Sequence, residues 1–518
     1  MTRNFPTAAK QKHVADASGL SIRAREDAIP GDHECMPTSC DKTVTSNPIA
    51  LESTSSAAPL HYLDLVEEQQ AAGHVGESVV VANDQGEDKT NASILCADTL
   101  IPGKGKPLSD HAVVIKDGKI AWTGPTTGIP SKYSNAPKTH VPFLMPGMWD
   151  CHVHLMGTTT LNFPEIMQTS PATAGARLSR SVHDILMSGF TSVRDVGGFA
   201  CEISKPIEEG IIPGPHIYSA GAAISQTAGH GDVFELPIGW LYSRAGVGSF
   251  GGAGDADIAG RPLCIADGVE ECRKAIRLQI RRGAKVIKIL ASGGVLSRDD
   301  DPHFQQFSDE EMAVMVREAG RFNRVVAAHV HGKPGIMAAL KAGCRTLEHG
   351  TYLDDEAVDL MKEKDAMLIA TRTIVVEATK HLDLIPPASR DKMKETAKYH
   401  KQAYELAIKR GVKIALGTDL GVSSPGEPLS HGRSGGELLY AVEAGMTPLE
   451  AIEAATANGP LSVGPMAPKT GQIKEGYDAD VIALTKDPLE DIGCLRDVRN
   501  ITHVWKRGEL FKYPGKLA

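Results

Sequence analysis

The chain has 518 residues, of which 42% are hydrophobic and 23% are charged, and it carries a net charge of −9 at pH 7. This length exceeds one average domain but suits a barrel with a smaller satellite domain. The acidic balance disfavours nucleic acid or an anionic membrane surface as a partner, and no apolar run approaches the ~18 residues that a membrane span needs.

Residues 1–90 differ in composition from the rest of the chain. They are rich in Ser, Thr, Ala, Asp and Glu and have few aromatic residues, which predicts a disordered extension. The first twenty residues contain basic side chains without a following apolar core, so no secretory signal is predicted. The nine cysteines include no CxxC pair. Together these features favour a cytoplasmic location, with secretion left open.

Short strands are expected on both sides of the central part of the chain. SILCADTLIPGKG and HAVVIKDGKIAWTGP form strand patterns with a tight turn at Asp117-Gly118. ADVIAL (residues 479–484) and ITHVWKRGEL (residues 501–510) repeat the pattern near the other end. The simplest arrangement pairs residues 91–140 with residues 466–518 in one small β-sandwich.

Residues 141–465 alternate apolar strands with amphipathic helices. Helical spacing is clearest over Gly268–Arg282 and Asp309–Asn323. Eight strand-helix units indicate an α/β protein with a (β/α)8 TIM barrel. A doubly wound sheet is the alternative, but no GxGxxG follows the first strand. The expected strands are Leu144–Asp150, Thr191–Asp195, His216–Ala220, Val286–Ser292, Val325–His329, Arg345–His349, Ala366–Thr371 and Lys413–Thr418.

The stretch PGMWDCHVHLMG follows the first expected strand. His152 and His154 are two residues apart, so on a strand both imidazoles face the same side. Beside Asp150 they would form half of a site for a divalent metal. A pair of hydrogen-bonded structural histidines is the simpler interpretation of this motif alone. Cys151 points to the opposite face, where core packing is expected.

Polar residues also mark four later strands: Lys288 on strand four, and His329, His349 and Asp419 after strands five, six and eight. Each has an ordinary explanation, such as a packed histidine, a lysine with a solvated head or a helix N-cap. In a barrel, however, the carboxyl ends of all strands meet at one mouth. The coincidence of these positions with His152 therefore favours a metal site over separate structural roles.

This set of residues resembles the amidohydrolase superfamily, whose members are metal-dependent hydrolases on a (β/α)8 barrel with a flanking β-sandwich. Longer blocks, such as GAAISQTAGHGD and MTPLEAIEAATANGPLSVGP, are similar to a fungal amidase of that superfamily. Its branch contains carboxypeptidase-like amidases, prolidases and imidazolonepropionase-like proteins. The similarity extends over roughly residues 92–514. Lys285 competes with Lys288 as the strand-four lysine, but alternation points it outward.

The resemblance implies two divalent metal ions, with zinc expected, although such ligands also accept cobalt or manganese. It implies that His152, His154 and Asp419 hold one metal, that His329 and His349 hold the other, and that carbamylated Lys288 bridges them. It further implies that a hydroxide between the metals attacks an amide carbonyl while Asp419 carries the proton to the leaving amine. Relatives form large homo-oligomers, so an octamer is implied.

The implied substrate is a small amide or dipeptide-like molecule, namely an N-acyl amino acid with an aromatic C-terminal residue, cleaved in the manner of a carboxypeptidase. The alternatives are an Xaa-Pro dipeptidase, a cyclic-amide hydrolase of the imidazolonepropionase type and a non-catalytic scaffold. The loops LMGTTTLNFPEIMQTS and LGVSSPGEPLSHGRSGGE depart from the fungal relative. The resemblance therefore predicts the metal ligands of this chain more safely than its substrate.

Six residues outside the metal set are candidates for contact with the substrate. His331, two residues after His329, could stabilise the oxyanion. Two belong to the glycine-rich loop after strand three, two arginines could pair with a carboxylate through bidentate hydrogen bonds, and a tyrosine could donate a hydrogen bond. These five are His230, Asp232, Arg298, Arg372 and Tyr352.

Overall fold

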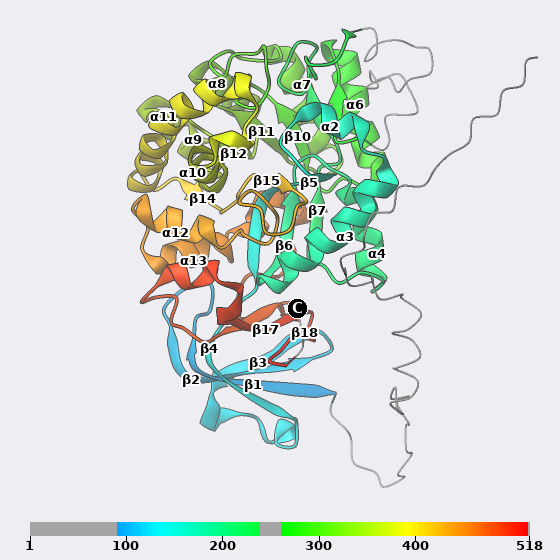
Figure 1. Ribbon diagram of the computed structural model, residues 1–518. Coiled ribbons are helices and arrows are strands. Elements are labelled where there is room, and N and C mark those ends of the chain that lie inside the picture. The colour runs from blue at the N-terminus through cyan, green and yellow to red at the C-terminus, as the bar shows by residue number, and fades with distance from the viewer. Residues whose placement is uncertain (1–90, 239–260, 516–518) are drawn as a thin grey trace, which may run out of the picture. The chain divides into compact units, whose positions relative to one another are not determined.

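The computed structural model describes residues 91–238 and 261–515 (Figure 1). The expected extension over residues 1–90 lies outside this described part. The described chain combines one mixed β-sheet with parallel strands that are surrounded by helices. No helix in it has both the length and the apolar character that a membrane span requires.

A seven-stranded mixed sheet joins the two ends of the described chain. In Figure 1 its early strands, in blue, lie beside its late strands, in red. Alternating apolar side chains bury one face around Leu95, Val113 and Trp505 and the other around Ile94 and Tyr133. In spatial order the strands are β18 (Glu509–Lys512), β17 (Ile501–Lys506), β16 (Val481–Leu484), β4 (Lys138–Pro146), β1 (Ala92–Leu100), β2 (Leu108–Lys116) and β3 (Lys119–Pro125).

The first barrel strand was predicted over Leu144–Asp150, and this prediction is wrong. Strand β4 ends at Pro146 and pairs with β1 and β16, whereas β5 (Met148–Thr158) pairs with the next parallel strand. The chain changes sheets at Gly147, where a Cβ atom would lie 2.2 Å from the hydroxyl of Thr191. The apolar run crosses both strands without interruption, so only the Pro-Gly pair marks the break.

The remaining strands are parallel and form two sheets. One has the order β14 (Lys413–Ile414), β13 (Met367–Ile369), β12 (Thr346–His349), β11 (Val326–Val330), β10 (Ile287–Leu290), β8 (Ala223–Ser225) and β9 (Leu263–Ile265). The other has the order β15 (Leu420–Val422), β5, β6 (Phe190–Asp195) and β7 (His216–Ser219).

Neighbours in these sheets follow one another along the chain except at β9, which lies outside β8, so that β10 pairs with β8 directly. The late strand β15 pairs with β5, the first parallel strand. Apart from the short strand β9, this order lacks the reversal that defines a doubly wound sheet. Backbone hydrogen bonds join the two sheets at both seams: for example, Lys285 donates to Ser219 and Cys151 donates to Leu416, each at 2.8 Å. The ladders of the described strands do not close into one continuous ring.

Helices cover the outer side of the parallel strands (Figure 1). The expected helix over Gly268–Arg282 is confirmed, and the helix expected from Asp309 begins there behind a capping box of Ser308 and Glu311. The helices are α2 (Phe163–Gln168), α3 (Pro171–Met187), α4 (Ala200–Glu208), α6 (Gly268–Arg282), α7 (Asp309–Gly320), α8 (Lys333–Ala342), α9 (Asp355–Glu363), α10 (Arg372–Lys380), α11 (Arg390–Lys409), α12 (Gly436–Glu443) and α13 (Pro448–Ala455).

Trp149 on β5 packs at the junction of the strands with the C-terminal segment. Its side chain is fully buried and stacks on Tyr218, with ring centroids 4.9 Å apart. Its indole N–H donates to the hydroxyl of Thr470 at 3.2 Å. Gly459 is required beside it, because a Cβ atom there would lie 2.4 Å from the indole ring. One side chain thus links three distant segments of the chain.

Replacing Trp149 by Ala should lower the free energy of unfolding by about 3–5 kcal/mol, because it leaves a large cavity in a close-packed region. Denaturant unfolding followed by circular dichroism measures this change. The Ile211→Ala variant is the control, since Ile211 is 70% exposed, and it should stay within about 0.5 kcal/mol. Equal effects of the two substitutions would contradict the packing role.

Candidate metal centre

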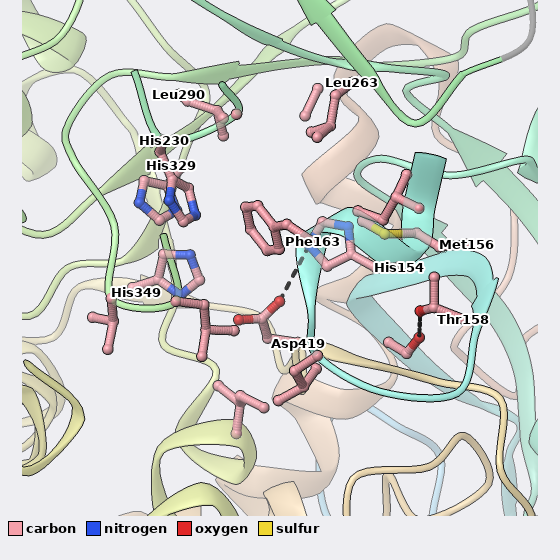
Figure 2. Close-up of a pocket in the computed structure, with 18 of the residues that line it drawn as sticks. His154, Met156, Thr158, Phe163, His230, Leu263, Leu290, His329, His349 and Asp419 are labelled. Atoms are coloured by element: carbon pink, nitrogen blue, oxygen red, sulfur yellow. Dashed lines mark hydrogen bonds and ion pairs between the residues drawn. The ribbon is translucent and has the colours of Figure 1, made fainter. Parts of the chain in front are cut away.

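Five of the predicted ligands gather where the parallel strands end. Figure 2 shows four of them, His154, His329, His349 and Asp419, and His152 lies beside His349 and Asp419. His329 lies on β11, His349 is the last residue of β12, and Asp419 directly precedes β15. His152 and His154 lie within β5 rather than after it, but Val153 pairs with Asp195, the last residue of β6. The two imidazoles therefore reach the same level as the other strand ends.

The hydrogen bonds of the β5 histidines determine which ring nitrogen carries a proton. Nδ1 of His152 lies 2.6 Å from a carboxylate oxygen of Glu348, and Nδ1 of His154 lies 3.0 Å from the carbonyl oxygen of Gly197. Carboxylate and carbonyl oxygens only accept, so each Nδ1 is the donor. In a neutral ring the lone pair then remains on Nε2, which is the form that binds a metal ion.

The same reasoning applies to the two other histidines. Nδ1 of His349 lies 2.7 Å from the hydroxyl of Thr371, which itself donates to the carbonyl of Ala370, so the hydroxyl accepts from the ring. Nε2 of His329 lies 3.2 Å from the carbonyl oxygen of Gly293. The free lone pair is therefore on Nε2 of His349 and on Nδ1 of His329.

Asp419 faces the lone pairs of both β5 histidines. Its Oδ1 lies 3.3 Å from Nε2 of His152 and 3.2 Å from Nε2 of His154. Burial alone would raise the pKa of Asp419, but the two histidines hold it well below its usual range. When the rings are neutral, the lone pairs of the two Nε2 atoms and of Oδ1 of Asp419 converge, and no hydrogen atom lies between them. This donor set fits a divalent cation.

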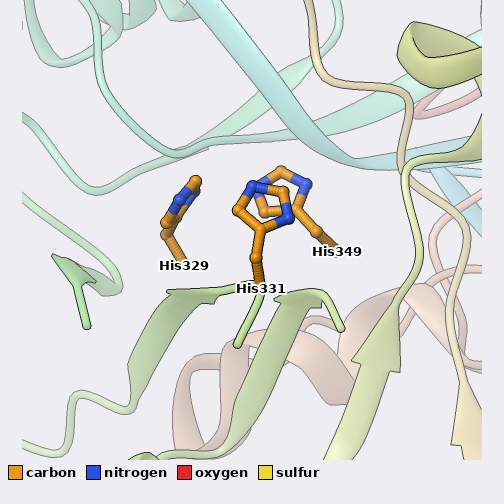
Figure 3. A group of neighbouring side chains, drawn as sticks. All are labelled: His329, His331 and His349. Atoms are coloured by element: carbon orange, nitrogen blue, oxygen red, sulfur yellow. The ribbon is translucent and has the colours of Figure 1, made fainter. Parts of the chain in front are cut away.

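A second group consists of His329, His331 and His349, whose ligand atoms lie within 4.8 Å of one another (Figure 3). The ring of His331 stacks on that of His349, with centroids 4.9 Å apart. Burial lowers the pKa of all three, for His331 to about 3. Neutral imidazoles are what metal binding requires. The structure thus adds His331, predicted as an oxyanion contact, to the possible ligands.

Lys288 lies on β10 with its side chain buried, 1% exposed, and lines the same pocket. Its Nζ has no hydrogen-bond partner among the described residues. Burial lowers the pKa of this amine to about 8, against the opposing effect of Glu348 and Asp419. Lys285, the competing lysine, instead lines a different cavity beside Lys506.

Sequence reasoning missed the buried ion pair behind His152. The guanidinium of Arg194 donates to both carboxylate oxygens of Glu348, at 2.8 and 2.7 Å, and both side chains are fully buried. Burial would raise the pKa of Glu348, but Arg194 and His152 hold it far below its ordinary value. The signal in the sequence was a glutamate directly before His349 in an apolar strand.

Asp150, which the sequence placed beside the metal ligands, positions the turn that carries Asp419. Its carboxylate accepts hydrogen bonds from the backbone N–H and the hydroxyl of Thr418, at 3.0 and 2.7 Å. Asp419 and His349 have φ angles of 62° and 69°. Left-handed backbone at such residues costs about 1–3 kcal/mol and is typical of functional sites.

Of the residues predicted to contact substrate, His230 and His331 line the pocket. Asp232 does not belong to the described pocket lining, and its carboxylate accepts from the backbone N–H of Ala228 at 2.8 Å. Tyr352 does not reach the described pocket lining, and its ring packs against His303, with centroids 4.6 Å apart.

The two candidate arginines point elsewhere in the described structure. The side chain of Arg298 is 54% exposed and lies 3.5 Å from the carboxylate of Asp299. The guanidinium of Arg372 donates to Nδ1 of His400 at 3.3 Å. Neither arginine belongs to the described lining of the pocket, so neither is placed to hold a substrate carboxylate there.

Apolar side chains line the pocket beside the histidines (Figure 2). Phe163, at the start of α2, contributes to this wall with Leu263 and Leu290. The loop before it is well anchored, because the carboxylate of Glu165 accepts hydrogen bonds from the backbone N–H and the hydroxyl of both Thr159 and Thr160. This is one of the loops whose sequence departs from the fungal relative.

Glu348→Gln should weaken metal binding about 10–100-fold, because an amide can rotate and no longer holds His152 in one tautomer. Metal content after dialysis against a buffered chelator measures this loss on the folded variant. Glu356→Gln is the matched control, since Glu356 is exposed and pairs with Lys333. Unchanged metal affinity in the Glu348 variant would contradict the positioning role.

The sequence and the fold both match known proteins. A model of the amidohydrolase family matches residues 143–511. Ochratoxinase of Aspergillus niger is 53% identical over 438 residues, which cover 83% of this chain and 88% of the relative. The crystal structure of that enzyme superposes with a TM-score of 0.76 at 51% identity, over 83% of this chain and 97% of the other.

More distant relatives also match this chain. A crystal structure of a prolidase complexed with N-methylphosphonate-L-proline matches with a TM-score of 0.73 at 33% identity, over 82% of this chain and all of the other. An imidazolonepropionase of Nocardia farcinica is 23% identical over 77% of this chain and 92% of its own. The chain therefore belongs to the amidohydrolase family and is a hydrolase that resembles ochratoxinase.

Proposed function

We propose that this protein is a binuclear metal-dependent amidohydrolase that cleaves the amide bond of N-acyl aromatic amino acids, with ochratoxin A, split into ochratoxin α and phenylalanine, as the specific candidate. The observation that carries the proposal is the set of four histidines whose free lone pairs converge with Asp419 and Lys288 beside an apolar wall. The 53% identity to ochratoxinase supports this choice of substrate.

The fold that we propose for the catalytic part is a closed (β/α)8 barrel, over about residues 141–465, with residues 91–140 and 466–518 as the β-sandwich. The largely sequential strand order, the pairing of β15 with β5 and the hydrogen bonds at both seams support closure. Strand β4 pairs with the sandwich strands, so Gly147 is a better boundary than residue 141.

We assign one metal to His152, His154 and Asp419 and the other to His329 and His349. Zinc is the proposed metal, since it favours imidazole and carboxylate ligands. When bound, two such ions would lower the pKa of a water molecule and polarise the scissile carbonyl.

Lys288 would bridge the metals as a carbamate. A neutral lysine amine adds to CO2 to give a carbamate and releases one proton, which turns the neutral amine into an anionic oxygen ligand. Burial already lowers the pKa of Lys288 to about 8, which makes the neutral amine accessible near physiological pH. The missing hydrogen-bond partner of Nζ within the described structure supports this role, because the added carboxylate would fill the space towards the histidines.

The remaining residues would handle protons and orient the substrate. Asp419, whose carboxylate stays ionised, would accept a proton from the attacking water and deliver it to the leaving nitrogen. His331 faces the same pocket and would support the charge that develops on the carbonyl oxygen. The wall around Phe163 would receive an aromatic ring of the substrate.

Two family members with other substrates are the alternatives. The similarity to a prolidase favours an Xaa-Pro dipeptidase as the second candidate. The cyclic-amide hydrolase is disfavoured by Lys288, which a site with a single metal does not need. A homo-oligomer, in particular an octamer, is proposed on the family resemblance alone.

A substrate panel tests the proposed function. Zinc-loaded protein should release phenylalanine from ochratoxin A and from N-acyl phenylalanine, and removal of the metal by a chelator should abolish the release. Chromatography of the products measures both. Faster cleavage of Xaa-Pro dipeptides would select the alternative, and a folded, metal-loaded protein inactive on the whole panel would refute the amidohydrolase proposal.

Lys288→Ala should lower the metal content from two ions to one or fewer per chain and reduce the rate by at least about 10³-fold, because the bridging ligand is lost. Elemental analysis and steady-state kinetics measure these effects, and formate should restore part of the activity by replacing the missing carboxylate. Lys285→Ala is the matched control and should keep both metals. A Lys288 variant with two metals and full activity would refute the bridge.

A further inference from the structure

His230 is held rigidly at the edge of the pocket, in the segment after β8. Its backbone N–H donates to the side-chain oxygen of Gln306, and the next N–H, of Gly231, donates to the hydroxyl of Ser225, both at 3.0 Å. Gly294 packs directly against the ring, since a Cβ atom there would lie 1.9 Å from Nδ1 of His230. The ring therefore has one well-defined position.

A chain of buried hydrogen bonds leads away from this ring. Nδ1 of His230 lies 2.7 Å from the hydroxyl of Ser297, and that hydroxyl hydrogen-bonds to Oδ1 of Asp300. The other oxygen of Asp300 accepts from the backbone N–H of Gly294 at 2.7 Å. The side chain of Asp300 is 2% exposed. Ser297 is also buried.

Lys392, on α11, holds the loop that carries this chain. Its Nζ donates to the backbone carbonyls of Gly294, Ser297 and Asp300, at 3.0, 2.7 and 2.9 Å. Burial would raise the pKa of Asp300, but His230, the hydroxyl of Ser297 and the ammonium of Lys392 hold it below its usual value. The carboxylate is therefore ionised and can only accept hydrogen bonds.

These bonds fix the tautomer of His230. Because the carboxylate of Asp300 only accepts, the hydroxyl of Ser297 must give it its one hydrogen. The same hydroxyl can then only accept from the ring, so Nδ1 of His230 is the donor. In the neutral ring Nε2 keeps its lone pair. The ring lies in the pocket between His329, with centroids 4.5 Å apart, and Phe163, at 5.6 Å.

We propose that Nε2 of His230 accepts a hydrogen bond from the N–H of the scissile amide, and that the Ser297–Asp300 pair makes the enzyme selective for secondary amides. This inference rests on the proposed amide hydrolysis. An ester oxygen or a tertiary amide, such as an Xaa-Pro bond, has no hydrogen to offer. Such a substrate would leave the acceptor Nε2 of His230 without a hydrogen-bond donor. A site built to hydrogen-bond a substrate group discriminates strongly against analogues that lack this group.

The Asp300→Asn variant tests the tautomer. The N–H of Gly294, 2.7 Å from the carboxylate, needs an acceptor, so the amide oxygen takes that side and the amide NH2 faces Ser297. The ammonium of Lys392 lies 3.3 Å from the Ser297 side, and there it keeps its three hydrogens on the closer backbone carbonyls. The hydroxyl of Ser297 must then donate to Nδ1 of His230, which moves the ring proton to Nε2. Nε2 of His230 is then a donor instead of an acceptor, and its hydrogen faces the hydrogen of the substrate N–H.

The measured quantity is a ratio of two kcat/KM values. The first is for the acyl amide bond of an N-acyl phenylalanine, and the second is for the matching ester, in which oxygen replaces the amide nitrogen. In Asp300→Asn this ratio should fall about 10²-fold relative to the unaltered protein, with the metal content unchanged. Histidine-selective 15N NMR of the metal-free protein should show the proton of His230 on Nδ1 in the unaltered protein and on Nε2 in the variant. Asp301→Asn is the matched control, since Asp301 pairs with His303, and it should leave the ratio unchanged.

The outcomes separate this inference from the proposed function. A metal-loaded protein that hydrolyses no amide of the panel refutes both. An active protein in which Asp300→Asn slows amide and ester equally, or neither, refutes the role of His230 and leaves the amidohydrolase intact. If Asp300→Asn does not fold, Ser297→Ala and His230→Ala should each lower the same ratio, and an unchanged ratio in both overturns the inference.

Discussion

The negative charge of Glu348, buried between Arg194 and His152, is the interaction on which the metal centre depends. Arg194 belongs to β6 and Glu348 to β12, so the pair joins the two parallel sheets in the interior. A buried charge is tolerated only when it is fully paired, and removal of one partner typically costs about 3–5 kcal/mol. The same carboxylate fixes the tautomer of His152. Stability and ligand geometry are therefore coupled through a single side chain.

One rule is repeated around the site for five of its histidines: the ring donates to an oxygen that can only accept from it. The acceptor is a carboxylate for His152, backbone carbonyls for His154 and His329, and a hydroxyl with its hydrogen already committed for His349. His230 follows the same rule through Ser297. Because these acceptors are buried, solvent cannot replace them, and the free lone pairs stay directed into the pocket.

The strands and the loops have separate tasks. The parallel strands and the residues at their ends carry the six proposed ligands, whose positions follow from the order of the sheets. Part of the pocket wall comes from the segment after β5, where Glu165 accepts four hydrogen bonds from Thr159 and Thr160 close to Phe163. A loop can change its side chains without moving the ligands. This division would allow the pocket wall to change while the proposed ligands keep their places.

The passage of the chain from the mixed sheet to the parallel strands at Gly147 was not predicted from the sequence. The apolar run from Val141 to Trp149 has no polar residue at which one strand would end, and side chains in it serve two different sheets. The predicted contacts of Arg298 and Arg372 with the substrate were wrong for a related reason. Their guanidinium groups turn to Asp299 and His400, and no local pattern reports the direction of a long side chain.

The sequence by itself determined the alternation of strands and helices and the polar residues that end the strands, because both are local patterns of period and position. It therefore sufficed to predict that His152, His154, Lys288, His329, His349 and Asp419 meet. Only the tertiary structure decided which nitrogen of each ring is free. That choice depends on partners such as Glu348 and Asp300, which lie far from their histidines in the chain and become neighbours only when the strands pack together.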